Sequence, residues 1–164
     1  MSLLELALVL ATLLCALTAG FVFAFASVVM PGIAKLSDRE FIRSFQVIDG
    51  VIQTGQPVFG LVWMGSVVAL LLSAVMGAVQ LGGMERAFVV ASALVYFLGV
   101  QVPTFTINVP LNNTLQGLNI DSMDEGVLAS ARNAFENRWV RWNSIRAITA
   151  SVVSVALMFV LLWL

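Results

Sequence analysis

One short segment near the C-terminal end, residues 139–146, carries residue types that are well suited to chemistry. Trp139, Trp142, Asn143 and Arg146 follow one another at i, i+3, i+4 and i+7, so a helix places them on one face. Only uncharged residues follow Arg146. A charged side chain at membrane depth is costly, so it either faces the interior of a helix bundle or extends back to the headgroups. The spacing alone leaves both orientations of Arg146 open.

A second polar face precedes it in the chain. Gln101, Thr104 and Asn108 are spaced at i, i+3 and i+7, which again predicts one face of a helix. Pro103 lies among them, removes a backbone hydrogen bond and is expected to kink the helix. Gln101 and Thr104 therefore have two possible roles: they line a site, or they satisfy the carbonyl that the proline leaves free.

The segment Asn-Val-Pro-Leu-Asn-Asn, residues 108–113, ends this apolar stretch. Val109 precedes Pro110 and is biased toward extended geometry, so we predict that the helix stops here. The stop explains the proline but only partly explains Asn108, Asn112 and Asn113. These asparagines either hold the arginine in place or form the wall of a polar site together with it.

The elements that must position these residues are membrane helices. The chain is 60% hydrophobic and 10% charged, whereas a soluble protein is about a quarter charged. Its charges are grouped and leave four long uncharged stretches, each able to hold one helix of the roughly 20 residues that cross a bilayer. We predict an all-α, four-helix integral membrane bundle in a single transmembrane domain, residues 1–164. The predicted spans are residues 6–30, 57–79, 87–107 and 144–163.

Two helix-start signals lie in the polar loops. Residues 37–40 and residues 122–125 both match the capping box, in which Ser and Glu satisfy free amides at a helix start. Apolar residues at helical spacing follow the first box over residues 41–52, which predicts an amphipathic helix in the first loop. The second box predicts a helix that begins near Met123 in the third loop and continues into the fourth span.

The positive charges favour one orientation in the cell membrane. Lys and Arg are concentrated in the first and third loops, so by the positive-inside rule these loops are cytoplasmic and both termini lie outside. The net charge of -1 gives no basic surface for nucleic acid. The residues that set this orientation are Lys35, Arg39 and Arg43 in the first loop and Arg132, Arg138 and Arg141 in the third, against Arg86 alone in the second.

Three predicted spans bring unusual residues to the cytoplasmic end of the bundle, including Met30 before Pro31. Together with Phe25 and the tryptophans, the amides and Arg146 suit a flat, apolar ligand that carries a carbonyl or phenolate oxygen. The chain has no His, one Cys and no carboxylate inside a span, so haem, zinc and non-haem iron sites lack their usual ligands. We therefore expect no cofactor, and a proton-coupled transporter is disfavoured.

These motifs, in this order, resemble a known family. They are Gly-x-x-Phe at residues 20–23, Met-Pro-Gly at 30–32, Phe-Gln-x-Ile at 45–48, the segment 108–113, and Trp-x-x-Trp-Asn-x-x-Arg at 139–146. The chain resembles the anthrone oxygenase-like family of small four-helix integral membrane proteins, many of which have no assigned function. The resemblance covers nearly the whole chain.

The resemblance implies an oxygenase without a cofactor that converts a polycyclic anthrone to an anthraquinone with dioxygen. Such a substrate loses a proton to give a stabilised carbanion, which itself reacts with oxygen, so the protein supplies a base and oxygen-stabilising donors. By the resemblance, Arg146, Asn143, Asn108 and Asn112 are these donors, and Trp139 and Trp142 stack on the rings. The other candidate ligand contacts are Asn113, Met30, Gln101 and Thr104.

The chain departs from the family pattern at two positions. Family members often have His where this chain has Ser144, and commonly have Asn where it has Asp49. Asp49 is either the missing base or an ordinary surface acid, and we expect the second.

Two functions therefore stay open. The protein is an oxygenase for an apolar aromatic or quinone-like molecule, or it is a non-catalytic accessory subunit or lipid- or quinone-binding membrane protein. The expected partners are membrane lipid and an apolar aromatic small molecule, with a homo-oligomer or a larger membrane complex both open.

Overall fold

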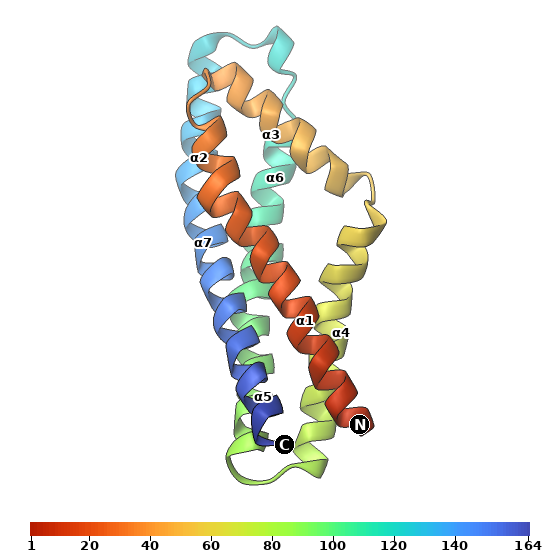
Figure 1. Cartoon of the computed structure of the whole chain (residues 1–164). Coiled ribbons are helices and arrows are strands. Elements are labelled where there is room, and N and C mark those ends of the chain that lie inside the picture. The colour runs from red at the N-terminus through yellow and green to blue at the C-terminus, as the bar shows by residue number, and fades with distance from the viewer.

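The computed structural model describes all residues, 1–164, and consists of helices without strands. Four long helical arms form the bundle, and a shorter helix crosses one end of it (Figure 1). The first arm consists of α1 (Leu3–Ala24), a π turn (Phe25–Val29) and α2 (Met30–Ile33), and α3 (Asp38–Gln53) then crosses to the second arm, α4 (Pro57–Gln80). The third arm consists of α5 (Gly83–Tyr96), two π turns (Phe97–Gln101 and Thr104–Asn108) and α6 (Val109–Gln116). A 3-10 turn (Ile120–Ser122) leads to the fourth arm, α7 (Glu125–Trp163).

All four arms are long and apolar enough to cross a membrane. The prediction of four spans is confirmed, and the chain is a multi-pass membrane protein. The helices extend beyond the predicted spans because the polar segments next to them are also helical. Their bounds are Leu3–Ile33, Pro57–Gln80, Gly83–Gln116 and Glu125–Trp163.

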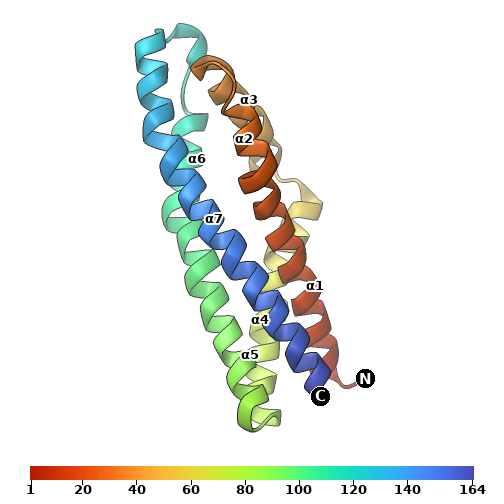
Figure 2. The ribbon, with the colours of Figure 1, turned by 60° about the vertical axis from the view of Figure 1, so that its left-hand side comes forward.

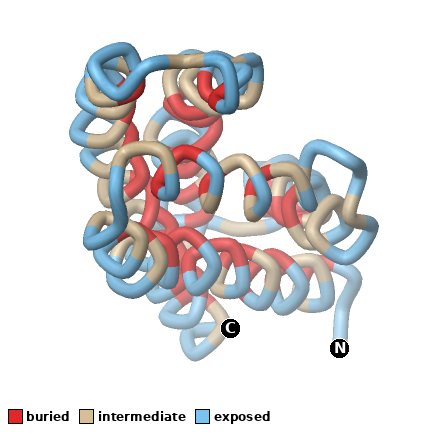
Figure 3. Tube along the Cα trace, turned by 90° about the horizontal axis from the view of Figure 1, so that it is seen from above, coloured by how far each residue is buried: buried red, intermediate tan, exposed pale blue.

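The arms pack in a ring in which α1 and α5 each contact both α4 and α7. Both termini and the α4–α5 turn lie at one end, and α3 lies at the other (Figures 1 and 2). α1 and α4 cross near the terminal end and diverge toward α3, which bridges them (Figure 1). The bundle is therefore closed at one end and spread open at the other. In the view from above, the buried parts of the chain lie mostly on the inner sides of the helices (Figure 3).

The prediction that the third helix stops at Pro110 is wrong. Val109 has helical angles, φ -63 and ψ -46, and the helix continues to Gln116. The reason is the π turn before the proline, in which the Val109 N–H donates to the carbonyl of Thr104, five residues back. The wider turn lets the backbone pass a residue that has no N–H and whose ring collides with the regular α-helical hydrogen-bonding pattern.

The other two prolines within the long arms follow the same pattern. Val102 precedes Pro103 and donates to Phe97, and Met30 precedes Pro31 and donates to Phe25, each across a five-residue step. Proline at these positions therefore widens the helix locally and does not end it.

The two predicted helix starts have different outcomes. The capping box of Ser37 and Glu40 at the start of α3 is confirmed, and hydrogen bonds from the Ser37 hydroxyl and main-chain N–H lower the pKa of the Glu40 carboxyl. α7 begins at Glu125, two residues after the predicted start, and its cap is Asp124, whose carboxylate accepts from the Val127 N–H. Ser122 lies in the preceding 3-10 turn and does not cap the helix.

Candidate functional site

A cavity of about 310 Å³ lies in the open half of the bundle, beneath α3. All four arms and α3 contribute to its walls. Aromatic rings form much of the lining, and polar side chains converge from α3, the third arm and α7. The aromatic residues are Phe21, Phe25, Phe45, Phe59, Trp63, Phe105 and Trp139, and the polar ones are Asp49, Thr104, Asn108, Asn112, Asn143 and Arg146.

Arg146 faces the interior of the bundle and does not extend to the headgroups. Its side chain is buried, with 5% of the residue exposed. Nη1 donates to Thr104 Oγ1 at 2.9 Å and Nη2 donates to Asn143 Oδ1 at 2.8 Å. The Nε–H has no partner, and none of the ion pairs of the chain includes this guanidinium. A buried cation without a counter-ion is a candidate functional group in a membrane protein.

Asn143 holds the guanidinium in place. Its Oδ1 accepts from Arg146, while its Nδ2 donates to the main-chain carbonyl of Val22 on α1 at 2.8 Å. Both polar atoms of the amide are therefore used within the protein. Asn143 thus orients Arg146 and ties α7 to α1 just before the π turn of the first arm.

Asp49 is the second charged group of the cavity. Only 4% of the residue is exposed, so the expectation of a surface acid is wrong. Oδ1 accepts from Asn112 Nδ2 at 2.7 Å, and Oδ2 accepts from Gln53 Nε2 at 2.7 Å and from Gln116 Nε2 at 3.1 Å. Three amide donors solvate this carboxylate and no cation pairs with it, which leaves its charge available to a ligand in the cavity.

The asparagines after Pro103 connect three elements. Trp139 Nε1 donates to Asn112 Oδ1 at 2.6 Å, and Asn112 in turn donates to Asp49. Asn108 Nδ2 donates to the main-chain carbonyl of Trp139 at 3.2 Å, while its Oδ1 is buried without a partner. These side chains hold the third arm against α3 and α7, and neither of them bonds Arg146.

The chain is similar to one family of known proteins. A family model described as anthrone oxygenase matches residues 50–156, about two thirds of the chain, and includes both the 108–113 segment and the 139–146 motif. The chain belongs to the anthrone oxygenase family. No curated protein and no solved structure gives a significant match.

Four of the predicted ligand contacts lie outside the cavity of this family member. Met30 is buried in the apolar cluster beneath α3, Trp142 is half-buried and Asn113 is exposed. Gln101 is buried and its Oε1 accepts from Trp63 Nε1 at 3.2 Å, so it orients a cavity ring from behind. The other predicted residues, Thr104, Asn108, Asn112, Trp139, Asn143 and Arg146, all line the cavity.

Sequence reasoning missed Asp49 and the aromatic residues of α4. For Asp49 a signal existed, because Phe41, Phe45 and Asp49 are spaced at i, i+4 and i+8 and therefore share the buried face of the amphipathic helix. For Phe59 and Trp63 no signal distinguished them, since aromatic residues in an apolar span equally fit a lipid-facing position.

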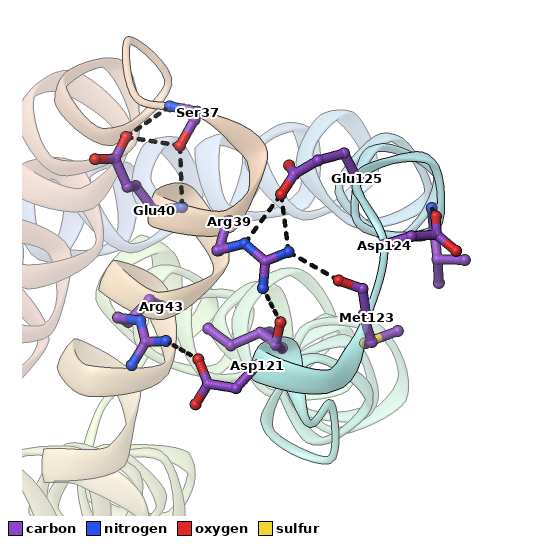
Figure 4. A network of polar contacts seen from close by, with 10 residues as sticks. Ser37, Arg39, Glu40, Arg43, Asp121, Met123, Asp124 and Glu125 are labelled. Carbon is purple, nitrogen blue, oxygen red and sulfur yellow. Dashed lines mark hydrogen bonds and ion pairs between the residues drawn. The ribbon is translucent and has the colours of Figure 1, made fainter.

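Ion pairs hold α3 in place above the cavity (Figure 4). Arg39 donates to Glu125 Oε1 from Nε at 3.0 Å and from Nη2 at 2.8 Å, and its guanidinium also donates to the carbonyls of Ile120 and Met123. Arg43 pairs with Asp121 one turn further along. The position of Asp49 in the cavity therefore depends on a clamp between α3 and residues 120–125, which lead into α7.

The chemistry available to this family member follows from its two charged groups. Asp49 comes from α3 and Arg146 from α7, and they are not paired with each other. A carboxylate accepts a proton, and a fixed guanidinium stabilises negative charge that develops on an oxygen. No three His, Cys, Asp or Glu side chains lie together as a metal-binding group.

Proposed function

We propose that the protein is a cofactor-independent oxygenase that binds a flat, oxygenated aromatic molecule in this cavity and removes a proton from it. The observation that carries the proposal is the placement of Asp49 and Arg146. Both are buried, both line one aromatic-walled cavity, and neither pairs with an opposite charge.

The walls suit a planar ring system. Trp139 packs against Phe25 at 5.8 Å between ring centroids, and Phe59 stacks on Trp63 at 5.5 Å, so aromatic rings from the first arm, α4 and α7 line the cavity. The volume of about 310 Å³ lies at the lower end of the range of small-molecule sites, which favours a compact ring over a large polar substrate.

In the proposed reaction Asp49 accepts a proton from an acidic CH₂ group of the bound ring. The electron pair of that C–H bond delocalises onto the ring oxygen, and the Arg146 guanidinium stabilises the resulting negative charge. A positioned base contributes about 10²- to 10⁴-fold, and a fixed donor at a developing oxyanion about 10²- to 10³-fold. Thr104 and Asn143 keep the guanidinium in one orientation, which removes its reorganisation from the reaction.

The oxygen chemistry balances with dioxygen as the only co-substrate. The carbanion carbon transfers its electron pair to dioxygen and forms a C–O bond, and the peroxide oxygen takes up the proton that Asp49 holds. Loss of the second C–H proton and cleavage of the O–O bond then give a ketone and water. The CH₂ group is oxidised to C=O, and one dioxygen molecule is reduced to one carbonyl oxygen and one water.

The proposal is tested with purified protein in detergent, treated with EDTA and supplied with anthrone. We expect oxygen uptake above the protein-free rate, with one dioxygen consumed per anthrone and no hydrogen peroxide released. Asp49→Asn should lose this rate. Glu85→Gln, next to the α4–α5 turn at the other end of the bundle and in no ion pair, should keep it. A rate equal to that of buffer, or an unchanged rate in Asp49→Asn, contradicts the proposal.

One observation favours a second function, that of a non-catalytic binder of an aromatic lipid or quinone. The amide N–H groups of Asn143 and Asn108, which were expected to stabilise a substrate oxygen, donate instead to main-chain carbonyls of the protein. Because these amide N–H groups are bonded within the protein, they are not free to stabilise a reacting oxygen, which suits a cavity that binds and retains a ligand. This function predicts tight binding of anthraquinone without consumption of anthrone.

We also propose that the cavity lies toward the cytoplasmic side, with both termini outside, as the distribution of Lys and Arg suggests. Cys15 is the only cysteine and is buried, so Cys15→Ala gives a clean background. A cysteine introduced at exposed Ser122 should react with an impermeant maleimide only after cells are opened, and one at exposed Ser2 should react in intact cells. The reverse labelling contradicts this orientation.

A further inference from the structure

A second cavity of about 590 Å³ lies beside the first, between α1, α3 and α4. We call it the outer groove, and we call the cavity with Asp49 and Arg146 the inner cavity. The outer groove has no charged residue in its lining, and Thr18 and Gln56 are its only polar side chains. The residues that line the outer groove alone are otherwise Leu17, Val47, Ile48, Val51, Val58 and Val62.

The two spaces share a wall of large side chains. Phe21, Phe25, Ile52, Phe59 and Trp63 line both and therefore stand at their boundary. Across this boundary, the rings of Phe21 and Phe59 lie 5.1 Å apart between centroids and link α1 to α4. Phe21 is 36% exposed, so this part of the boundary is not packed within the core.

The outer groove opens toward the lipid. It lies where α1 and α4, two of the membrane-spanning helices, diverge beneath α3 (Figure 1). Its rim carries apolar side chains that are exposed on the surface of the protein, with Leu17 49%, Val58 63% and Val51 56% exposed. A molecule dissolved in the bilayer therefore reaches the groove without crossing water.

We propose that the outer groove binds the apolar chain of a ligand whose oxygenated ring lies in the inner cavity, and that this ligand enters sideways from the bilayer. The inference rests on the proposed function of the inner cavity. It narrows the substrate class to an aromatic ring that bears a hydrocarbon chain and excludes a compact tricycle as the best-fitting ligand.

The separation of polar and apolar surface carries this inference. The charged residues and the asparagines line only the inner cavity, while the larger outer groove has no charged residue and is apolar apart from Thr18 and Gln56. A bare ring satisfies the inner cavity and leaves the larger space unused. A ring with a chain fills both, with its polar end innermost and its apolar end next to the lipid from which it came.

The hydrophobic effect alone favours the bound chain little, because lipid tails are as apolar as the groove, so tighter binding comes from van der Waals packing of the chain against the groove walls. A chain held in the groove also limits the positions of the ring between Asp49 and Arg146. We therefore expect bulkier side chains in the groove to abolish the preference for a ligand that carries a chain, while the chemistry of the inner cavity stays intact.

The test compares anthraquinone with 2-decylanthraquinone, and binding to protein in nanodiscs is read from the quenching of tryptophan fluorescence. Val51→Phe combined with Val62→Phe fills the groove. Val68→Phe is the matched control, since Val68 lies on α4, is exposed and lines neither space. We expect wild type and the control to bind the chain-bearing probe at least tenfold more tightly than the bare ring. The double variant should lose this preference and bind anthraquinone within twofold of wild type.

Val58→Phe at the exposed rim provides a second variant if the double variant does not fold, and it should reduce the same preference. Equal affinity of wild type for the two probes overturns the inference. A second outcome also overturns the inference: the groove variant loses a bilayer lipid that co-purifies with wild type, but its preference between the two probes does not change. The groove then holds an ordinary lipid tail. If wild type fails to bind anthraquinone, the proposed function fails as well. If it binds anthraquinone and oxidises anthrone but shows no preference for a chain, only this inference fails.

Discussion

The two halves of the bundle treat their buried polar groups differently. In the closed half, next to the termini, Thr12, Ser73 and Ser154 each donate to a carbonyl one turn back on their own helix, and none of the buried groups is charged. In the open half, Asn112, Asn143 and Arg146 bond across different elements around a cavity. The difference separates polar residues that a membrane helix tolerates from polar residues that build a site.

The backbone follows the same division. The π turn Phe25–Val29 contributes Phe25 to the inner cavity, and the π turn Thr104–Asn108 contributes Thr104, Phe105 and Asn108. π turns are uncommon and frequently mark functional sites. In this chain each π turn is followed by a proline, which accounts for the position of the turn. The prolines are therefore the common origin, in the sequence, of the widened helices and the cavity.

The largest effect is expected at Asp49. Asp49→Asn retains the size of the side chain and one acceptor oxygen but removes the proton acceptor, so anthrone oxidation should fall by about 10²- to 10⁴-fold. Turnover by the purified variant measures this loss, with the melting temperature in detergent as a control for folding. If turnover persists in the variant, Asp49 is not the base, and the chemical difference proposed between the two halves does not hold.

Replacement of Arg146 should have the next largest effect. Arg146→Met removes the guanidinium but keeps the length of the apolar stem, and turnover should fall by about 10²- to 10³-fold. Arg146→Lys should recover part of the rate because it restores the positive charge without the two-sided contact to Thr104 and Asn143. A variant that loses activity only in proportion to its loss of folded protein would falsify the catalytic role.

Close packing is tested where the third arm meets α7. A Cβ added at Gly99 would lie 2.6 Å from Thr149 Cγ2 and 3.0 Å from its Oγ1, so rotation of the threonine does not relieve the collision. Gly99→Ala should destabilise the fold by about 1–3 kcal/mol, as overpacking does elsewhere. Thr149→Ala should restore the stability in the double variant. Equal melting temperatures of wild type and Gly99→Ala contradict tight packing at this contact.

The clamp on α3 should give the smallest effects. The ion pair of Arg43 and Asp121 is exposed on both sides, and such pairs contribute roughly 0–1 kcal/mol, so Arg43→Ala should change the melting temperature little. Arg39→Ala should matter more because its guanidinium also binds two main-chain carbonyls. Hydrogen exchange of residues 118–124 should increase in Arg39→Ala and stay near wild type in Arg43→Ala; the opposite order contradicts the clamp.

Much of the fold follows from the spacing of charges in the sequence, because the length of an uncharged stretch limits how many helices it holds. The orientation of Arg146 did not follow, since the periodicity of one helix does not say which face meets the bundle. The predicted helix stop at Pro110 was wrong because a π turn overcame the bias of Val109 toward extended geometry. The prediction that Asp49 lies on the surface was wrong although a signal was present: its spacing from Phe45 indicated the buried face of the helix, but its charge suggested the surface.

The most direct test of the account measures proton removal apart from oxygen chemistry. Under anaerobic conditions in D₂O, the protein should exchange the acidic CH₂ protons of anthrone for deuterium faster than buffer does, as followed by mass spectrometry. We predict that Asp49→Asn lowers this exchange rate at least 100-fold, within the range expected for loss of a general base, while Glu85→Gln leaves it unchanged. Equal exchange rates in wild type and Asp49→Asn would contradict the central claim that Asp49 acts as a base in the inner cavity.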